Sequence, residues 1–280
     1  MENNEIQFRK KRELGDILSD SFAFLKQEYK PISSLILVYV LPFLILYGAV
    51  QVYVQMKVFV NFNFNDPEEL MAQIGPFYAN VFMVTLFGIF VQSLLLGTFY
   101  SYIEIYVKKG KGNFDVAEIK PLLFSNSLLA LGAGIIVYLL IVAGAVLCFV
   151  PGIYFANTFS LTIVIILFER KGLGNALARS RSLVHKQWWN TFLLNLIGIL
   201  IIFAVGFVLS IPNLVAGVTR TIGSVASGGE PFNYPTWYWV LSGVSSIVSL
   251  LLWIVPATFI AMQYFNLDER TKSDVSEIRN

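Results

Sequence analysis

The side chains that could take part in chemistry are few and lie far apart. His185 is the only histidine and Cys148 the only cysteine, so the chain has no internal disulfide and no CxxC pair. The HExxH zinc motif, the GxSxG nucleophile motif and the P-loop are absent, and GLGN at 172–175 is a weak phosphate signal on its own. We therefore expect no catalytic residue, no metal, no cofactor and no enzymatic activity. A membrane-embedded hydrolase is the least favoured interpretation, because no nucleophile–base pair is visible.

Glu104 is the one ionisable residue within a long apolar stretch, which is the strongest sign of a transport site that this sequence offers. It precedes Lys108 by one helical turn, and the spacing predicts an ion pair near the membrane interface. Neutral polar residues lie deeper in the apolar segments and favour hydrogen bonding between helices. The candidate buried polar centre is Tyr154, Asn157, Ser160 and Glu104.

A second candidate site lies where a short amphipathic segment leads into an apolar one. Its residues are Arg179, Arg181, Lys186, Trp188 and Trp189. Arginine and lysine bind phosphate through charge and N–H donors, and tryptophan is enriched at membrane–water interfaces. This pattern predicts contact with an anionic lipid headgroup or with a membrane partner.

The composition places these residues in a membrane protein. Of 280 residues, 56% are hydrophobic and 14% charged, against roughly 25% charged in soluble domains. No charged residue occurs between Pro121 and Phe168, which is more than twice the about 20 residues that one helical span requires. The apolar runs do not alternate in polarity as β-barrel strands do, so the spans are predicted to be helical.

The predicted fold is an all-α membrane domain, 14–267, with six transmembrane helices, polar tails at 1–13 and 268–280, and short cytoplasmic amphipathic elbow helices before each helical hairpin. The expected spans are 32–55, 76–106, 127–149, 152–168, 188–211 and 235–266. Pro42 predicts a kink in the first span, and Val150-Pro151-Gly152 predicts a turn between the third and fourth. Loops are expected at 57–75 and 213–234, and frayed or mobile chain in both tails.

Three segments are expected to form the elbow helices, namely 14–30, 111–125 and 173–186. Asp16 is a candidate N-cap for the first, and Asp115 for the second. The octets Leu14–Ser21 and Leu173–Ser180 share the pattern L-G-[DN]-x-L-x-x-S. This likeness favours a repeated unit of elbow and hairpin.

The distribution of positive charge predicts the orientation. With six spans, every Lys and Arg except Lys57 and Arg220 lies on one face, and such residues concentrate on the cytoplasmic side. Both termini are therefore predicted to be cytoplasmic in a cell inner membrane. The net charge of +2 is explained by this segregation, and no soluble domain with a basic groove is present to bind nucleic acid.

Several of these segments resemble a family of uncharacterised bacterial and archaeal membrane proteins related to the membrane domain of glycerophosphoryl diester phosphodiesterases. The residues that carry the resemblance are Pro151–Tyr154, Glu169, Ala176–Ser180, Trp188-Trp189 and Tyr264–Arg270. The resemblance implies a six-helix membrane module. It does not imply phosphodiesterase activity, because in that family's enzymes catalysis belongs to a separate soluble barrel that this chain lacks.

Two functions follow as hypotheses. The first is a non-enzymatic membrane protein that organises lipid, a membrane partner or a second copy of itself through its elbow helices. The alternative is a transporter or channel for a small or lipidic solute.

The orientation yields the first testable prediction. Residues near Gly110 and near Ser180 should resist an impermeant labelling reagent applied to intact cells and react after the membrane is permeabilised, because both neighbourhoods are expected to be cytoplasmic. Labelling of either from outside the cell would contradict the predicted topology.

Overall fold

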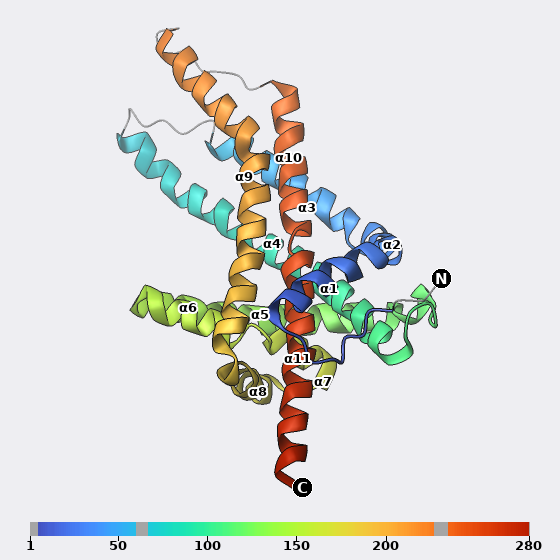
Figure 1. The fold of residues 1–280 in the computed structure, drawn as a ribbon. Helices are drawn as coiled ribbons and strands as arrows, with labels where there is room; N and C mark the ends of the chain where they lie inside the picture. The colour runs from blue at the N-terminus through green and yellow to red at the C-terminus, as the bar shows by residue number, and fades with distance from the viewer. Residues whose placement is uncertain (1–4, 60–66, 227–234, 280) are drawn as a thin grey trace. The chain divides into compact units, whose positions relative to one another are not determined.

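The computed structural model describes residues 5–59, 67–226 and 235–279, and all secondary structure within them is helical. Contacts divide the chain into two compact units. Unit 1 comprises Met1–Val40, Ser93–Leu200 and Trp253–Asn280, and unit 2 comprises Leu41–Gln92 and Ile201–Leu252. The long helices α4 (Pro67–Lys109) and α9 (Trp188–Ala226) contribute to both units (Figure 1).

Five helices in the described part of the chain are long and apolar enough to cross a membrane, or six when one broken pair is counted as a span. The broken pair is α2 (Tyr29–Tyr39) and α3 (Leu41–Val54), which is followed by a π-helical turn at Gln55–Phe59. The interruption falls at Val40, immediately before Leu41-Pro42. Proline lacks an N–H and disfavours helical geometry in the residue before it, so Pro42 explains the break that the sequence predicted.

Several helices extend further than predicted. α4 begins at Pro67, so residues 67–75 are helical and not a loop, and Pro76 lies inside the helix. α9 continues through Pro212 to Ala226, where a loop was expected from residue 213. The remaining parts of these two predicted loops at 60–66 and 227–234 lie outside the described residues. Proline inside a helix leaves the carbonyl four residues earlier without its N–H partner, and apolar helices tolerate this when other groups satisfy that carbonyl.

The helices α5 (Lys120–Leu147) and α6 (Phe149–Thr158) form a hairpin in unit 1 that runs across α11 (Ile254–Arg279), as Figure 1 shows. The turn is Cys148 alone, which is extended, whereas Pro151 and Gly152 lie in the first turn of α6. The predicted Pro-Gly turn is therefore displaced, because proline fits the first turn of a helix. Gly144 and Gly152 pack at the closest approach: a Cβ on Gly144 would lie 3.1 Å from Gly152 N.

The two similar octets form corresponding structures. α1 (Leu14–Gln27) and α8 (Leu173–Lys186) have equal lengths and begin at the matched leucines. Three matched positions are buried in both helices, Ile17, Ser21 and Phe24 in α1 and Ala176, Ser180 and Leu183 in α8, and Val184 is buried in α8 as well. One residue then breaks each helix, Glu28 or Gln187, before the next helix starts on an aromatic residue. Burial of one stripe is typical of an amphipathic helix.

The other capping and elbow predictions need correction. The N-cap of α1 is Glu13, and Asp16 instead accepts the Glu13 N–H at 3.2 Å. The segment 111–125 forms no elbow helix, because it holds only the 3₁₀ turn Val116–Glu118 and the start of α5. Asp115 Oδ1 accepts the Ala117 N–H in that turn. Lys109 hydrogen-bonds the exposed Glu118 and lowers the pKa of its carboxyl.

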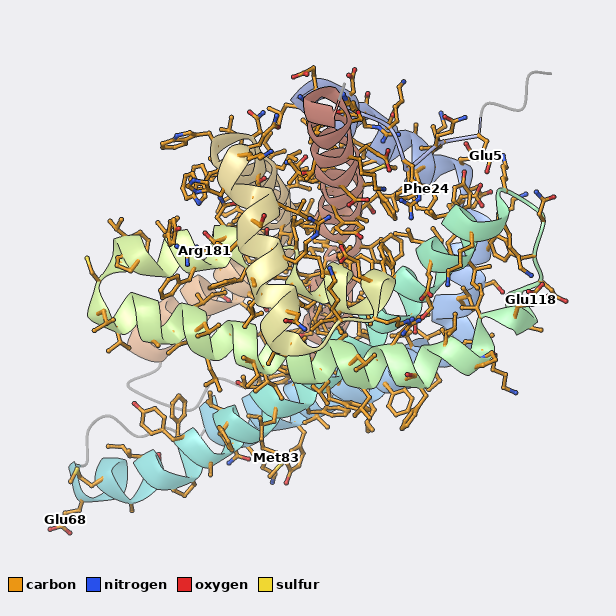
Figure 2. All side chains as sticks on the ribbon, turned by 90° about the horizontal axis from the view of Figure 1, so that it is seen from below. Glu5, Phe24, Glu68, Met83, Glu118 and Arg181 are labelled. Atoms are coloured by element: carbon orange, nitrogen blue, oxygen red, sulfur yellow. The ribbon has the colours of Figure 1, made fainter. Side chains whose placement is uncertain are left out.

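Residues 5–13, which we call the strap, are packed against unit 1 and are not a mobile tail. Phe8 is 3% exposed and packs edge-on against Phe24, Tyr106 and Phe265. Phe24 is labelled on α1 in Figure 2. Arg12 is also buried: its backbone N–H donates to Asn266 Oδ1 at 2.8 Å, and its Nε pairs with Asp20 at 2.8 Å. The predicted C-terminal tail is likewise ordered, since α11 continues to Arg279.

Unit 2 is held by a close contact between α3 and α10 (Thr236–Leu251). A Cβ on Gly48 would lie 3.1 Å from Gly243 O, so the two helix backbones approach closely. Small residues permit this spacing between apolar helices. Ser242 Oγ adds a hydrogen bond to Gln55 Oε1 at 2.8 Å.

Gly97 provides a test of the packing of unit 1. A Cβ at Gly97 would lie 2.4 Å from Ser127 Cα, in the backbone of α5. Gly97→Ala should therefore lower the free energy of unfolding by about 1–3 kcal/mol through overpacking. The control Gly132→Ala meets open space and should be neutral or stabilising by up to about 1 kcal/mol through helix propensity. Unfolding in detergent measures both, and equal effects would show that α4 and α5 do not pack this closely.

Candidate functional site

Glu104 lies at the centre of a buried polar network in unit 1. It is 5% exposed, and Arg170 Nη2 donates to its two carboxylate oxygens at 3.0 and 2.8 Å. Lys108 Nζ lies 2.7 Å from Oε1, so the predicted ion pair one turn apart is confirmed. Asn126 Nδ2 donates to Oε2 at 3.3 Å and to Ser101 Oγ at 2.8 Å, and its Oδ1 accepts from Arg170 Nη1 at 2.7 Å. The buried carboxylate therefore has four hydrogen bonds.

Arg170, whose side chain contacts Glu104, has an unusual backbone conformation. It caps α7 (Thr162–Glu169) with φ 52° and ψ 32°, the left-handed region in which non-glycine residues are uncommon. Strain of this kind persists where surrounding contacts fix the residue. From the sequence, Arg170 is one of the cations expected at the cytoplasmic face. Its pairing with Glu104 could not be predicted from a local sequence pattern, because 66 positions separate the two residues.

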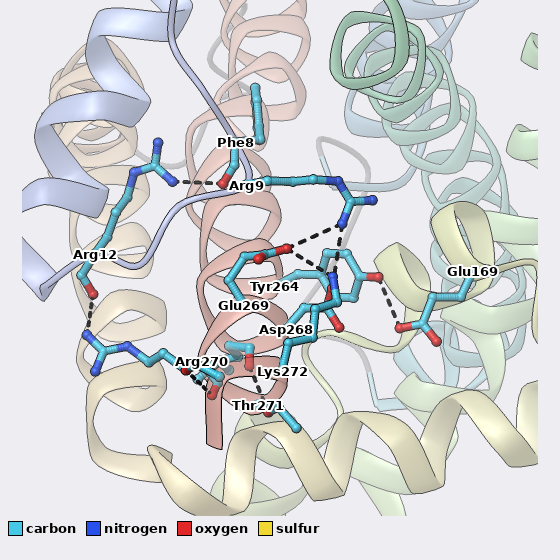
Figure 3. A network of polar contacts seen from close by, with 12 residues as sticks. Phe8, Arg9, Arg12, Glu169, Tyr264, Asp268, Glu269, Arg270, Thr271 and Lys272 are labelled. Atoms are coloured by element: carbon cyan, nitrogen blue, oxygen red, sulfur yellow. Dashed lines mark hydrogen bonds and ion pairs between the residues drawn. The ribbon is translucent and has the colours of Figure 1, made fainter. Parts of the chain in front are cut away.

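A second ionic cluster lies around Glu169 and Asp268. Arg179 connects them, with Nη2 2.7 Å from Asp268 Oδ1 and Nε 3.4 Å from Glu169 Oε1. The Tyr264 hydroxyl donates to Glu169 Oε1 at 3.0 Å, as Figure 3 shows. Asp268 also pairs with Lys272 at 2.7 Å. Arg179, predicted to contact headgroups, is thus half-buried and bound to two carboxylates of its own chain.

The two clusters line one cavity of about 270 Å³ in unit 1. Arg9 of the strap reaches its rim and lies 3.7 Å from Asp268 Oδ2 and 3.5 Å from Glu269 Oε1 (Figure 3). Its lining includes Arg9, Lys108, Arg179 and Lys272 as cations and Glu104, Glu169 and Asp268 as carboxylates, so its charges are largely matched.

The predicted buried polar centre is brought together only in part. Asn157 is buried, donates to Trp188 O at 3.0 Å and accepts from Asn195 Nδ2 at 2.8 Å. Ser160 Oγ donates to Asn157 O at 2.8 Å. Tyr154 is instead 40% exposed and stacks on Trp188 with ring centroids 6.2 Å apart. Glu104 belongs to the separate ionic network described above.

Three of the five predicted headgroup residues, Lys186, Trp188 and Trp189, gather at the corner between α8 and α9. An open hollow of about 620 Å³ is lined there by Tyr154, His185, Lys186, Gln187, Trp188, Trp189 and Asn190. Trp188 stacks on Phe192 at 5.3 Å, and the neighbouring Trp189 is 70% exposed. Arg181, labelled in Figure 2, is exposed on α8 and is not among the residues that line the hollow.

Within the described residues, no group of three or more His, Cys, Asp or Glu side chains is arranged to hold a metal ion. No protein-family model, curated protein or solved structure matches this chain. The fold and the site thus define an all-helical chain with several helices apolar enough to cross a membrane, a buried ionic network and an aromatic hollow at a helix corner.

The network around Glu104 can be tested by removing one cation at a time. Arg170→Met should lower the free energy of unfolding by about 1.5–3 kcal/mol, because it removes charged hydrogen bonds from a buried carboxylate. Lys108→Met removes an ammonium whose side chain is 61% exposed and should cost only about 0–1 kcal/mol. Denaturant unfolding of both variants in detergent measures the difference. A larger loss for Lys108→Met would contradict the network.

Proposed function

We propose that this chain is a non-enzymatic, multi-pass protein of the cell inner membrane that organises lipid at its cytoplasmic face through the corner between α8 and α9. The observation that carries this proposal is the open hollow lined by Lys186, Trp188 and Trp189 together with Tyr154. Exposed tryptophan beside a lysine is the composition of a membrane-interface anchor. A membrane partner or a second copy of the chain could use the same corner.

The chemistry of the corner favours an anionic lipid. Lysine and arginine near a membrane surface are attracted to anionic headgroups by about 1 kcal/mol per residue. Lys186 provides such a charge in the hollow, and the exposed Arg181 provides another on α8 outside it. The indole rings provide an apolar surface at the depth of the headgroups. Arg179 takes no part in this proposal, because it is bound to Glu169 and Asp268. The cytoplasmic orientation rests on the bias of positive charge, and the family resemblance stays a prediction.

The alternative, a transporter or channel for a small or lipidic solute, is favoured by one observation. A carboxylate on an apolar helix is costly to bury and often marks a solute or proton path, and Glu104 is such a group. The hydrogen bonds of Glu104 to Arg170 and Asn126 would equally suit a structural role, in which no solute is bound. Solute flux in proteoliposomes is the measurement that separates the two functions.

The lipid function predicts a loss of bound lipid when the corner is altered. Trp189→Ala and Arg181→Ala should each reduce the anionic lipid retained by the purified protein in native mass spectrometry, because they remove interfacial apolar area and charge. The matched control is Trp237→Ala, which removes a similarly exposed tryptophan of α10. Retention that is unaffected by both corner variants, or reduced equally by Trp237→Ala, would contradict lipid binding at this corner.

A further inference from the structure

A second, smaller cavity lies between three segments of unit 1 that are distant in sequence. It has a volume of about 210 Å³ and is lined by the strap, the end of α8 and the middle of α11. Its polar lining residues are Lys11, Lys186, Gln187, Arg270, Thr271 and Ser273. Arg270 and Thr271 are labelled on α11 in Figure 3. We call it the cationic cavity.

The charges of this cavity have one sign. Lys11, Lys186 and Arg270 line it, and none of the described lining residues is acidic. The larger cavity near Asp268 differs, because there Glu104, Glu169 and Asp268 accompany the cations. Arg270 is paired with Glu13 at 2.7 Å, and Lys186 also has an interaction partner. The ammonium of Lys11 is the charge at this cavity for which the described residues supply no counter-ion, and an anion in the cavity would supply one.

Two of the cations retain unused donors. Lys11 is exposed, and among the described residues its ammonium has no hydrogen bond or ion pair. Arg270 donates from Nε to Asn266 Oδ1 at 3.1 Å and from Nη2 to Arg12 O and Glu13 Oε1, both at 2.7 Å. Within the described part of the chain, its Nη1 atom has no acceptor. These bonds fix the plane of the guanidinium, and Nη1 is the donor that they leave unused.

We propose that the cationic cavity binds a phosphate group. Arginine presents parallel N–H donors that match phosphate oxygens, and lysine adds a mobile point charge. The volume lies below the about 300–1,000 Å³ of pockets that enclose drug-sized ligands, so the cavity suits a phosphate moiety and not a nucleotide. The ligand is either a soluble phosphate or the phosphomonoester headgroup of a lipid.

The cavity adjoins the aromatic hollow, since Lys186 and Gln187 line both. One lipid could therefore place its phosphate in the cationic cavity and its glycerol region against the tryptophans. Phosphate binding does not depend on the proposed lipid function, because a soluble phosphate needs only the cavity.

The test compares two neighbouring lysines of the strap in the full-length protein. Lys11 lines the cavity, whereas the exposed Lys10 does not. Binding is measured for inorganic phosphate in a neutral detergent, and for phosphatidylcholine vesicles with and without phosphatidic acid. Arg270 is left unchanged because it also holds the strap.

Lys11→Gln should weaken binding about tenfold, equal to about 1.4 kcal/mol, while Lys10→Gln should leave it unchanged. An effect on inorganic phosphate identifies a soluble ligand, and an effect confined to phosphatidic acid vesicles identifies a headgroup. Equal effects of the two variants in both arms, or no binding by the unaltered protein, would overturn the proposal. A Lys11-dependent phosphate signal with normal lipid retention in the Trp189→Ala variant would support this cavity and contradict the lipid function.

Discussion

The structure of unit 1 depends on the cost of burying carboxylates at the ends of apolar helices. Glu104, Glu169 and Asp268 belong to three different helices, and each is at most one-fifth exposed at its side chain. An ion removed from water loses several kcal/mol of solvation, so each carboxylate requires cations and hydrogen-bond donors nearby. Arg170 and Arg179 meet that requirement from the end of α7 and from α8. These ion pairs join α4, α7, α8 and α11 and so fix the positions of the helices relative to one another.

The same requirement explains why the strap and the end of α11 are ordered. Neither segment has an apolar run that would mark it as part of a core, because charged and polar residues dominate both the strap and the last turns of α11. The strap nevertheless inserts Phe8 into an aromatic cluster and buries Arg12 against Asp20. Arg270 of α11 then donates to the Arg12 carbonyl, so a polar backbone group of the strap has its hydrogen-bond partner on α11. Residues far apart in sequence supply each other's hydrogen-bond partners, as buried polar groups require.

These features separate what the sequence could predict from what it could not. The helical class, the break at Pro42 and the Glu104–Lys108 pair depend on local pattern and were predicted. The correspondence of the two octets also extends to helices of equal length. Arg170 and the strap were missed because their partners are distant in sequence. The helix at 268–279 was missed because packing, more than propensity, decides whether polar segments become helical, and Asp268 is buried by residues distant in sequence. Residues 71–75 are mostly exposed, and no packing among the described residues explains why 67–75 continue α4.

Three arginines of unit 1 hold carboxylates of the same chain, whereas Lys11 has no such partner among the described residues. Arg12 and Arg179 are tied to carboxylates inside unit 1, and Arg170 is tied to the most deeply buried of them. The planar guanidinium suits such fixed, multiple hydrogen bonds, whereas the lysine ammonium is compact and mobile. Lys11 lies at the surface of the cationic cavity, outside the internal pairs. An anion in the proposed cationic cavity would therefore be bound without breaking the ionic contacts that hold the helices.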